Sequence, residues 1–182
     1  PGLAAVASDR RMRLELASRL EVVSSAILAV TGELSLDKVL HRIVDLAREL
    51  AGARYAALGV PNAEGELVQF VTSGLTAEEE ARIGARPRGR GILGLLLTER
   101  RSIRLADLRE HPAAVGFPPE HPPMRNFLGM PIVAHGRVLG NRYLTEKRIG
   151  PEFTEADEQL IELIARHAAV AIENARLYSE IE

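Results

Sequence analysis

Residues 127–145 of this 182-residue chain read FLGMPIVAHGRVLGNRYLT. Two largely apolar runs, 127–134 and 137–145, flank the dipeptide His135-Gly136, which is typical of a tight turn. The stretch predicts an antiparallel β-hairpin, and the rest of the chain is interpreted around it.

A second hairpin is predicted nearer the N-terminus. Residues 54–60 form a short apolar run, 61–65 read PNAEG, and the apolar residues alternate over 67–72. Turn residues between two such runs favour an antiparallel pair of strands. Residues 101–105 predict one more strand, and the proline-rich stretch 106–123 predicts a long loop.

Helices are predicted on both sides of these strands. Ser35 is the expected N-cap of a helix over 36–50, whose core face should be Leu36, Val39, Leu40, Ile43, Leu46 and Ala47. Thr76 with Glu79, and Thr154 with Asp157, have the spacing of residues that cap a helix start. A short helix is therefore expected near 77–83 and a long one over 155–182. Residues 92–97 are too apolar to face solvent and are expected to form a short buried helix.

The two ends of the chain carry apolar stripes at heptad-like spacing. The stripe of the helix expected over 9–31 is Leu16, Leu20, Val23, Ile27 and Val30, and that of the last helix is Ile161, Ile164, Ala168, Ala171, Ala175 and Tyr178. Either both helices cover one face of the sheet, or they pair in a homodimer and continue into neighbouring domains. We divide the chain into an N-terminal signalling helix (1–34), a mixed core (35–154) and a C-terminal helix (155–182).

Composition excludes several kinds of chemistry. The chain has no cysteine, which rules out disulfides, zinc–thiolate sites and thiol catalysis. Lys and Arg number 23 against 25 Asp and Glu, so the net charge of -2 argues against nucleic acid as a partner. No apolar run approaches the length of a membrane span, and no signal peptide is evident. We expect a cytoplasmic protein without a membrane partner.

The chain carries few catalytic motifs. Gly89, Gly91 and Gly94 match G-x-G-x-x-G, but they follow a Pro/Arg loop instead of a strand, so a dinucleotide site is not expected. No two of the five histidines are three or four residues apart, which excludes a di-histidine metal face on a helix. No nucleophile elbow, Walker motif or EF-hand is present.

His121 differs from the other histidines. It stands in GFPPEHPPM, residues 116–124, where prolines on both sides restrict the backbone, and Phe117, Met124 and Phe127 make the surroundings apolar. Such a histidine is either a structural residue bonded to backbone or a ligand. A single well-held imidazole suits haem, which needs one axial donor and a dry pocket, better than zinc.

Several blocks of sequence together resemble one family. They are ARYAALGV at 53–60, GFPP at 116–119, HPPMRNFLG at 121–129, GN at 140–141 and YLTEK at 143–147. Over about residues 20–178 the chain resembles a GAF domain, and more narrowly the haem-binding first GAF domain of the actinobacterial dormancy sensor histidine kinases (DosS/DosT/DevS type). The resemblance implies an α+β fold: an antiparallel sheet of five or six strands, terminal helices on one face and ligand-binding loops on the other.

The same resemblance implies a noncovalently bound haem b. His121 falls where the family has the axial ligand of the haem iron, and Tyr143 where it has a distal tyrosine whose hydroxyl meets a diatomic gas. A phenol hydroxyl can stabilise partial negative charge on dioxygen more than on carbon monoxide. The alternative for Tyr143 is an ordinary strand aromatic with its hydroxyl on backbone.

Further residues are expected beside the haem. The resemblance places Phe70 and the loop from Pro87 to Ile92 near the porphyrin edge; with the apolar neighbours of His121, the expected set is Phe70, Pro87, Gly89, Gly91, Ile92, Phe117 and Met124. Gly59 falls at a position that is acidic in one family member, and here it removes a possible polar gate.

Arg142 departs from the family pattern, in which an apolar residue precedes the distal tyrosine. Strand alternation puts Arg142 on the face opposite Tyr143. If that face packs against the terminal helices, the guanidinium is expected to have an acidic partner or a route to solvent.

We therefore expect a haem-based gas or redox sensor (O2, NO or CO) from a signal-transduction protein such as a two-component histidine kinase, with the kinase activity outside these residues. One alternative is a haem enzyme or repurposed catalyst acting on peroxide, oxygen or a carbene donor. The other is a haem-free GAF module that binds another small ligand or only dimerises. Cysteine-anchored bilin binding and thiol-based methionine sulfoxide reduction both require a cysteine, which the chain lacks.

Overall fold

The structure, a computed structural model, describes residues 35–62, 64, 67–84, 91–117 and 120–179. The helix predicted over 9–31 lies outside these residues, and so do residues 85–90 and the proline pair 118–119.

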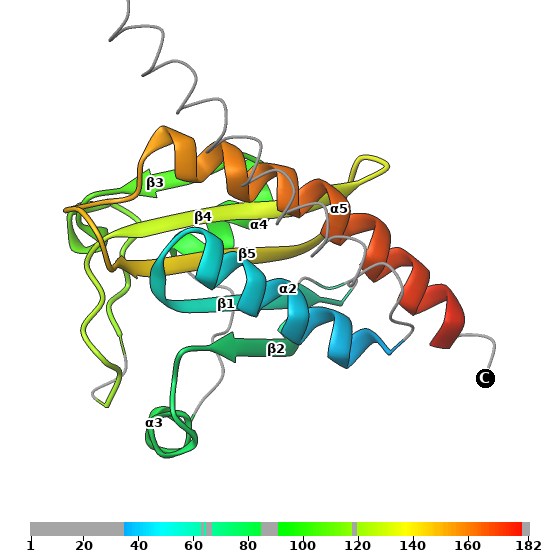
Figure 1. The fold of residues 1–182 in the computed structure, drawn as a ribbon, viewed down its shortest axis with the longest axis horizontal. Helices are drawn as coiled ribbons and strands as arrows, with labels where there is room; N and C mark the ends of the chain where they lie inside the picture. Colours follow the sequence, from blue (N-terminus) through cyan, green and yellow to red (C-terminus); the bar gives the residue numbers. More distant parts are fainter. Residues whose placement is uncertain (1–34, 63, 65–66, 85–90, 118–119, 180–182) are drawn as a thin grey trace, which may run out of the picture.

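Five strands form one antiparallel sheet in the order β2-β1-β5-β4-β3 (Figure 1). Their bounds are β1 Ala53–Pro61, β2 Leu67–Ser73, β3 Ile103–Leu105, β4 Phe127–Ala134 and β5 Arg137–Lys147. Both predicted hairpins, β1–β2 and β4–β5, are confirmed. The β4–β5 turn forms at His135-Gly136, where both residues have positive φ angles, 47° and 72°. Such angles match the twist of the strands they connect.

The strand β5 is the centre of the sheet, since it pairs with β1 on one side and β4 on the other. Tyr143 lies opposite Ala57 and Gly129, whereas Arg142 lies opposite Leu58 and Met130. Because side chains alternate along a strand, Tyr143 and Arg142 lie on opposite faces of the sheet.

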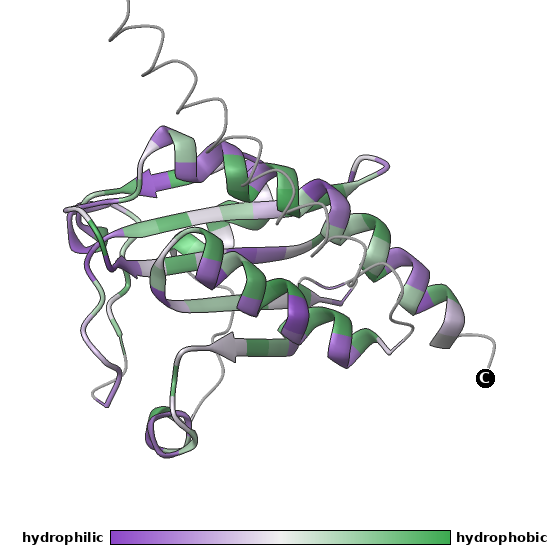
Figure 2. Cartoon of the chain, in the orientation of Figure 1, coloured by the Kyte–Doolittle hydropathy of each residue, from purple (hydrophilic) through white to green (hydrophobic). Residues whose placement is uncertain are grey.

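Helices α2 (Leu36–Leu50) and α5 (Glu155–Ser179) cover one face of this sheet (Figure 1). Both interleave hydrophobic and hydrophilic residues along their length, as expected of helices with one buried side (Figure 2). The face that α2 buries consists of Val39, Leu40, Ile43, Val44 and Ala47. The predicted stripe of α5 is buried from Ile161 to Ala175, but Tyr178 is exposed because the last turns of α5 extend past the strands (Figure 1).

The other face of the sheet carries α4 (Ile92–Glu99), with α3 (Ala77–Ile83) at its β2 edge (Figure 1). The capping box of α3 is confirmed: Glu79 N donates to Thr76 Oγ1 over 3.1 Å, and Thr76 N donates to Glu79 Oε2 over 2.8 Å. These bonds hold the pKa of Glu79 below its usual value, the backbone bond being the main cause. The predicted pair of Thr154 and Asp157 is also present at the start of α5.

Two predictions in the stretch 101–123 are corrected. The strand begins at Ile103 instead of Arg101, because Arg101 pairs with Glu99 and Ser102 donates to Glu158 of α5. The expected loop contains a short 3-10 helix, η1 (Leu108–Glu110), whose first turn is closed by the side chain of Asp107 accepting from Arg109 N.

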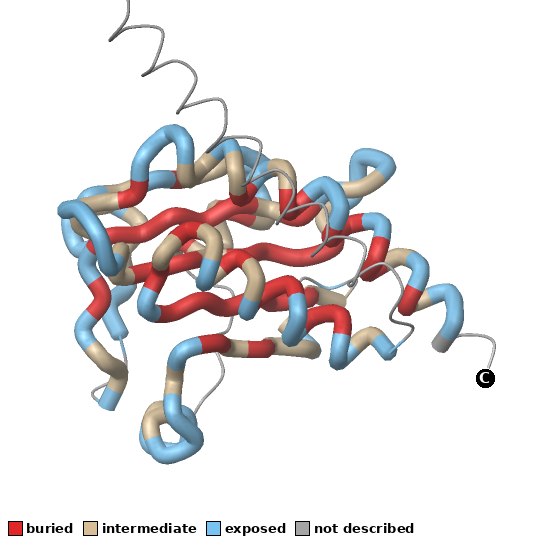
Figure 3. Tube along the Cα trace, in the orientation of Figure 1, coloured by how far each residue is buried: buried red, intermediate tan, exposed pale blue. Residues whose placement is uncertain are grey.

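Burial follows this arrangement, with the three central strands the most completely buried part of the chain (Figure 3). One apolar cluster joins α2 and α5 to the sheet. A second, smaller cluster lies on the opposite face of the sheet and consists of Ile92, Leu96, Ile103 and Phe127. A cavity lies beside the second cluster, and Ile92 and Phe127 belong to both.

Candidate functional site

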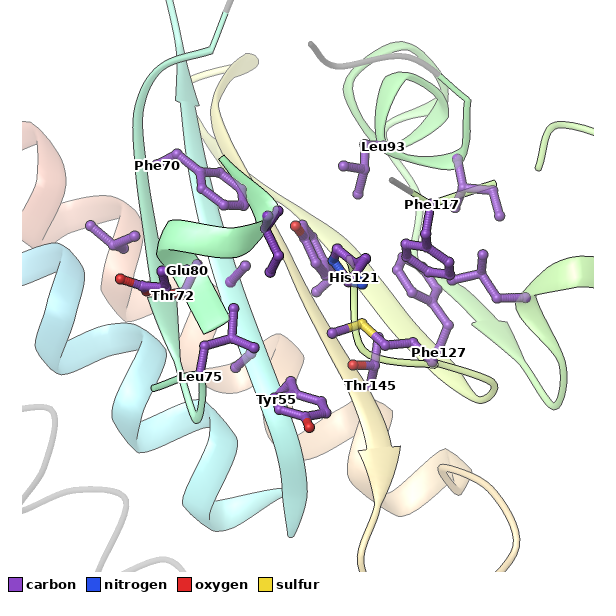
Figure 4. Close-up of a pocket in the computed structure, with 18 of the residues that line it drawn as sticks. Tyr55, Phe70, Thr72, Leu75, Glu80, Leu93, Phe117, His121, Phe127 and Thr145 are labelled. Carbon is purple, nitrogen blue, oxygen red and sulfur yellow. Dashed lines mark hydrogen bonds between the residues drawn. The ribbon is translucent and has the colours of Figure 1, made fainter. Parts of the chain in front are cut away.

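A cavity of about 690 Å³ lies beside the smaller apolar cluster (Figure 4). Its walls come from strands β1, β2 and β5, from α3 and α4, and from the segment 108–124. The volume falls within the range of about 300–1,000 Å³ that is usual for small-molecule and cofactor sites.

Six of the ten predicted cofactor-binding residues line this cavity: Phe70, Ile92, Phe117, His121, Met124 and Tyr143. They come from β2, α4, the 106–124 segment and β5, so residues far apart in sequence do meet at one place. Pro87 and Gly89 lie outside the described residues.

Two predicted residues do not line the cavity. Gly59 faces Asn141 and Leu67, and a Cβ added there would lie 2.7 Å from Asn141 Oδ1. Gly91 is the N-cap of α4, with φ of 65°, and a Cβ there would lie 2.8 Å from the carbonyl oxygen of Ala113. Both glycines permit close packing near the cavity, and neither lines it.

One nitrogen of the His121 imidazole is hydrogen-bonded to the backbone, and the other has no hydrogen bond to a described residue. Nδ1 lies 2.9 Å from the carbonyl oxygen of Pro122, and because a carbonyl can only accept, Nδ1 carries the proton. The neutral ring therefore has its lone pair on Nε2. The ring also stacks on Phe117, with 4.5 Å between centroids and 22° between planes, which fixes its orientation further (Figure 4).

Tyr143 is held by two aromatic rings, Phe127 at 5.9 Å and Phe70 at 6.3 Å between centroids. Its hydroxyl makes no hydrogen bond to any residue that the structure describes. Burial raises the pKa of Tyr143 well above its usual value, so the hydroxyl remains a protonated donor. The alternative of a phenol bonded to backbone is not what the structure has.

Sequence reasoning missed several lining residues, among them Tyr55, Ala57, Leu93 and Thr145. Thr145 could have been found, because it is two residues from Tyr143 on the same face of β5. Its hydroxyl is buried without a hydrogen-bond partner in the described structure. Tyr55 and Ala57 could be placed at the cavity only once the β1–β5 register was known, because that register sets them opposite Thr145 and Tyr143.

The β2 edge of the cavity is polar. Asp37 and His41 of α2 line it together with Thr72 and Glu80, and the Thr72 hydroxyl donates to the Glu80 carboxylate. His41 Nδ1 lies 3.6 Å from Asp37 Oδ2. The remainder of the lining is largely apolar, so the cavity has one acidic end.

Arg142 lies on the opposite face from Tyr143, as alternation predicts, but the expected acidic partner or route to solvent is wrong. The side chain is 0% exposed and forms no ion pair with a described residue. Its Nη2 donates to the carbonyl oxygen of Ile161 in α5 over 2.6 Å. Burial lowers the pKa of Arg142 to about 9.

A metal ion held by protein side chains alone has no evident place in the described part of the chain. No group of three or more His, Asp or Glu side chains gathers there. His121 is thus a solitary donor in an apolar setting. Of the described helices, none combines the length and apolar character needed to cross a membrane.

The sheet covered by two helices on one face, with a lined cavity on the other, defines an α+β domain built around an internal site. The chain belongs to the GAF domain family, whose model matches residues 33–173. The match includes every described lining residue of the cavity.

Solved structures agree with this assignment. The GAF domain of a phosphoenolpyruvate-protein phosphotransferase from Coxiella burnetii is 27% identical, with a TM-score of 0.76, and the match covers 89% of this chain and 96% of that one. A free methionine-R-sulfoxide reductase from Neisseria meningitidis, in complex with its substrate, is 19% identical (TM-score 0.72, covering 90% and 93%). A GAF domain/HD domain protein from Geobacter sulfurreducens is 21% identical (TM-score 0.66, covering 81% and 98%). The last two likenesses concern the fold alone.

Proposed function

We propose that this GAF domain binds haem b through His121 and works as a gas or redox sensor of the dormancy-kinase type. The observation that carries the proposal is the His121 imidazole, whose Nδ1–H is bonded to Pro122 O within an apolar cavity. A hydrogen bond of this kind, on the ring nitrogen that does not hold the metal, fixes the tautomer and would raise the basicity of the other nitrogen as a ligand.

The residues present fit the group. The cavity has the size of a cofactor site, its lining near His121 is apolar, and the solitary imidazole is the donor set that haem requires. When bound, haem would supply an iron with a coordination position open to a diatomic gas.

The chain's own residues would then divide the work. His121 donates its Nε2 lone pair, and the Phe117 ring keeps the imidazole from turning. Phe70, Phe127 and Leu93 exclude water. Tyr143 offers a protonated hydroxyl that no described residue occupies, and so can donate a hydrogen bond to a gas that carries negative charge.

The acidic end of the cavity would disfavour the negatively charged groups of haem. Asp37 and Glu80 line one end of the cavity, and their carboxylates would repel the propionate groups of haem from that end.

The test is a titration of the purified chain with ferric haem, followed by its Soret absorbance. His121→Ala should weaken binding by at least about tenfold, equivalent to about 1.4 kcal/mol, and change the spectrum. His135→Ala is the matched control, because His135 is 84% exposed in a hairpin turn. Equal affinity and an identical spectrum for His121→Ala would overturn the proposal.

The rival functions give different results in the same system. A chain that takes up no haem at all would be a module for another ligand or for dimerisation. A chain that binds haem and turns over peroxide or a diazo donor far faster than free haem would be an enzyme. A sensor binds haem and gas but shows turnover close to that of free haem.

Participation in signalling is part of this proposal. The similar structure from Geobacter sulfurreducens comes from a protein that combines a GAF domain with an HD domain. A sensor needs an element through which the site acts on its neighbours, and we propose that the terminal helices have this role, in a homodimer or toward an adjoining domain.

A further inference from the structure

Arg142 is the largest fully buried side chain in the described part of the structure. It lies in the layer between the sheet and the helices, with Leu58 beside it on β1 and Met130 on β4. The surrounding cluster is apolar on every side, including Leu128, Leu144 and Ile161.

The guanidinium is poorly satisfied in this layer. Nη2 donates to Ile161 O over 2.6 Å and lies 3.6 Å from Met130 Sδ, while Nε and Nη1 have no hydrogen-bond partner in the described structure. A guanidinium has five N–H donors, and here one carbonyl accepts. The carbonyl of Ile161 is also the acceptor that α5 would use for its own next turn.

Two effects oppose each other at this residue. The charge-assisted bond to Ile161 O holds α5 to the sheet, whereas removal of the cation from water without a counter-ion favours any state in which water reaches it. For a fully buried cation that lacks an anion, the loss of hydration exceeds the gain from a single hydrogen bond. Arg142 therefore works against the packing that covers it.

The helices α2 and α5 cover this face of the sheet through side-chain packing, and α5 is the one that supplies the acceptor of Arg142. The strands β1 and β4 are joined to β5 by ladders of backbone hydrogen bonds on both sides of Arg142. No such ladder joins α5 to the sheet, and it covers Arg142 with side chains and the Ile161 carbonyl. Opening the helix layer breaks fewer bonds than opening the sheet.

The start of α5 is anchored more firmly than the rest. Lys147 Nζ lies 2.7 Å from Asp157 Oδ1, and Arg104 lies 3.1 Å from Glu158 Oε2. Both anchors precede Ile161. Beyond Ile161, Glu173 of α5 contacts His135 in the β4–β5 turn, whose ring is 84% exposed.

We infer that Arg142 gives α5 two states. In one, α5 is packed on the sheet; in the other, the helix beyond Ile161 moves away from the sheet and the guanidinium reaches water. The anchors at Asp157 and Glu158 act as the hinge. The packed state is the one in this structure, and the other state exposes the guanidinium and part of the apolar layer. Local openings of this kind have free energies well below that of global unfolding.

This opening does not depend on what fills the cavity. A link between the two does rest on the proposed function: an occupant that pushes on Tyr143 would also displace Arg142, its neighbour in β5, and thereby alter the seating of α5.

Amide hydrogen exchange of the full chain without haem tests the inference. Arg142→Met removes the charge and retains an unbranched side chain, and Arg137→Met makes the same change at an exposed position of the same strand. We expect amides of 161–179 to exchange at least tenfold more slowly in Arg142→Met, and at the unchanged rate in Arg137→Met. Amides of β1 should change less than those of α5.

Equal or faster exchange of 161–179 in Arg142→Met would overturn the inference, since Arg142 would then hold the helix down. Arg142→Gln supplies a second, neutral variant that can still donate to Ile161 O, and it should also slow the exchange. Failure of both variants to fold would equally overturn it. Because no haem is present, these results are separate from any failure of the proposed function.

Discussion

Tyr143 and Arg142 are joined by one peptide bond, yet the ring of Tyr143 lines the cavity and the guanidinium of Arg142 is buried beneath α5. The central strand β5 thus presents a polar group to each layer of the domain. One is a hydroxyl without a partner in the described structure, and the other is a cation without an anion.

Replacement of Tyr143 by Phe should lower the affinity for oxygen more than the affinity for carbon monoxide. If the hydroxyl donates to bound dioxygen, its loss removes a hydrogen bond to a charged acceptor, worth about 1.5 kcal/mol, and lowers oxygen affinity by about tenfold. Carbon monoxide carries less charge, so its affinity should change much less. Gas titrations of the ferrous protein measure both, and an equal change for the two gases would contradict the role given to Tyr143.

The raised pKa of Tyr143 makes a related prediction about pH. Because burial holds the phenol protonated, oxygen affinity should show no titration of this hydroxyl up to about pH 10, where a free tyrosine is half ionised. Oxygen affinity measured between pH 7 and about pH 10 tests this. A decline centred near pH 10 in the unchanged chain, absent in Tyr143→Phe, would show that the phenol ionises normally.

Arg142 should give the domain an unusual pH dependence of stability. Burial lowers the pKa of Arg142 to about 9, well below the usual value for arginine. The folded state therefore releases this proton before the unfolded state does, so the contribution of Arg142 to the free energy of unfolding rises as pH increases through about 9, by at most about 1.4 kcal/mol per pH unit. Below that pH its destabilising effect is constant.

Denaturant unfolding of the chain and of Arg142→Met, compared at pH 7 and near pH 10, measures this effect. The variant should be more stable at neutral pH by about 1–4 kcal/mol, and the difference should shrink at the higher pH. The comparison with Arg142→Met cancels the opposite contribution of Tyr143, whose neutral folded state loses stability as the unfolded phenol ionises. A difference that is constant with pH would contradict the lowered pKa.

Lys147 joins three elements at the base of the domain. Its Nζ donates to Ala51 O at the end of α2 over 2.8 Å and to Asp157 in α5 over 2.7 Å, and both partners in the ion pair are 13% exposed. Lys147→Met leaves the largely buried Asp157 with its hydrogen bonds from Thr154 but without a cation, so unfolding free energy should fall by about 3 kcal/mol. Arg166→Met breaks the exposed pair with Glu162 and should cost at most about 0.5 kcal/mol. Similar losses in both variants would show that burial does not matter here.

Gly59 should resist any side chain. A Cβ there would lie 2.7 Å from Asn141 Oδ1 and 2.9 Å from Leu67 Cδ2, so Gly59→Ala should lower the unfolding free energy by about 1–3 kcal/mol. Asn141→Ala in the same chain removes one of the two contacts, and the pair should cost less than the sum of the single changes. Strict additivity in denaturant unfolding would mean that the strain arises elsewhere.

The local features of the fold could be predicted from sequence because nearby residues determine them. The His135-Gly136 turn, the capping pairs at Thr76 and Thr154, and most of the buried face of α2 were predictable from residue type and spacing. In α2, Val44 was missed, and Leu36 and Leu46 are only partly buried. The N-cap at Ser35 was located correctly, although its side chain does not close the first turn of α2.

The site was predictable in part, because it depends on contacts between distant segments. His121 and Tyr143 were found through their motifs, and alternation would have added Thr145. Tyr55, Ala57 and the acidic end formed by Asp37 and Glu80 depend on the register of β1 and the placement of α2 and α3, which no short pattern contains. The setting of Arg142 was mispredicted for the same reason: it depends on which α5 carbonyl happens to lie above β5.

The most direct test of the central claim is chemical rescue at position 121. His121→Gly should lose the haem spectrum of the unchanged chain, and added imidazole should restore it by occupying the space of the missing ring, whereas imidazole should leave the His135→Gly control unaltered. If His121→Gly instead binds haem with the original spectrum and affinity in the absence of imidazole, the iron has another ligand and the proposed site is wrong.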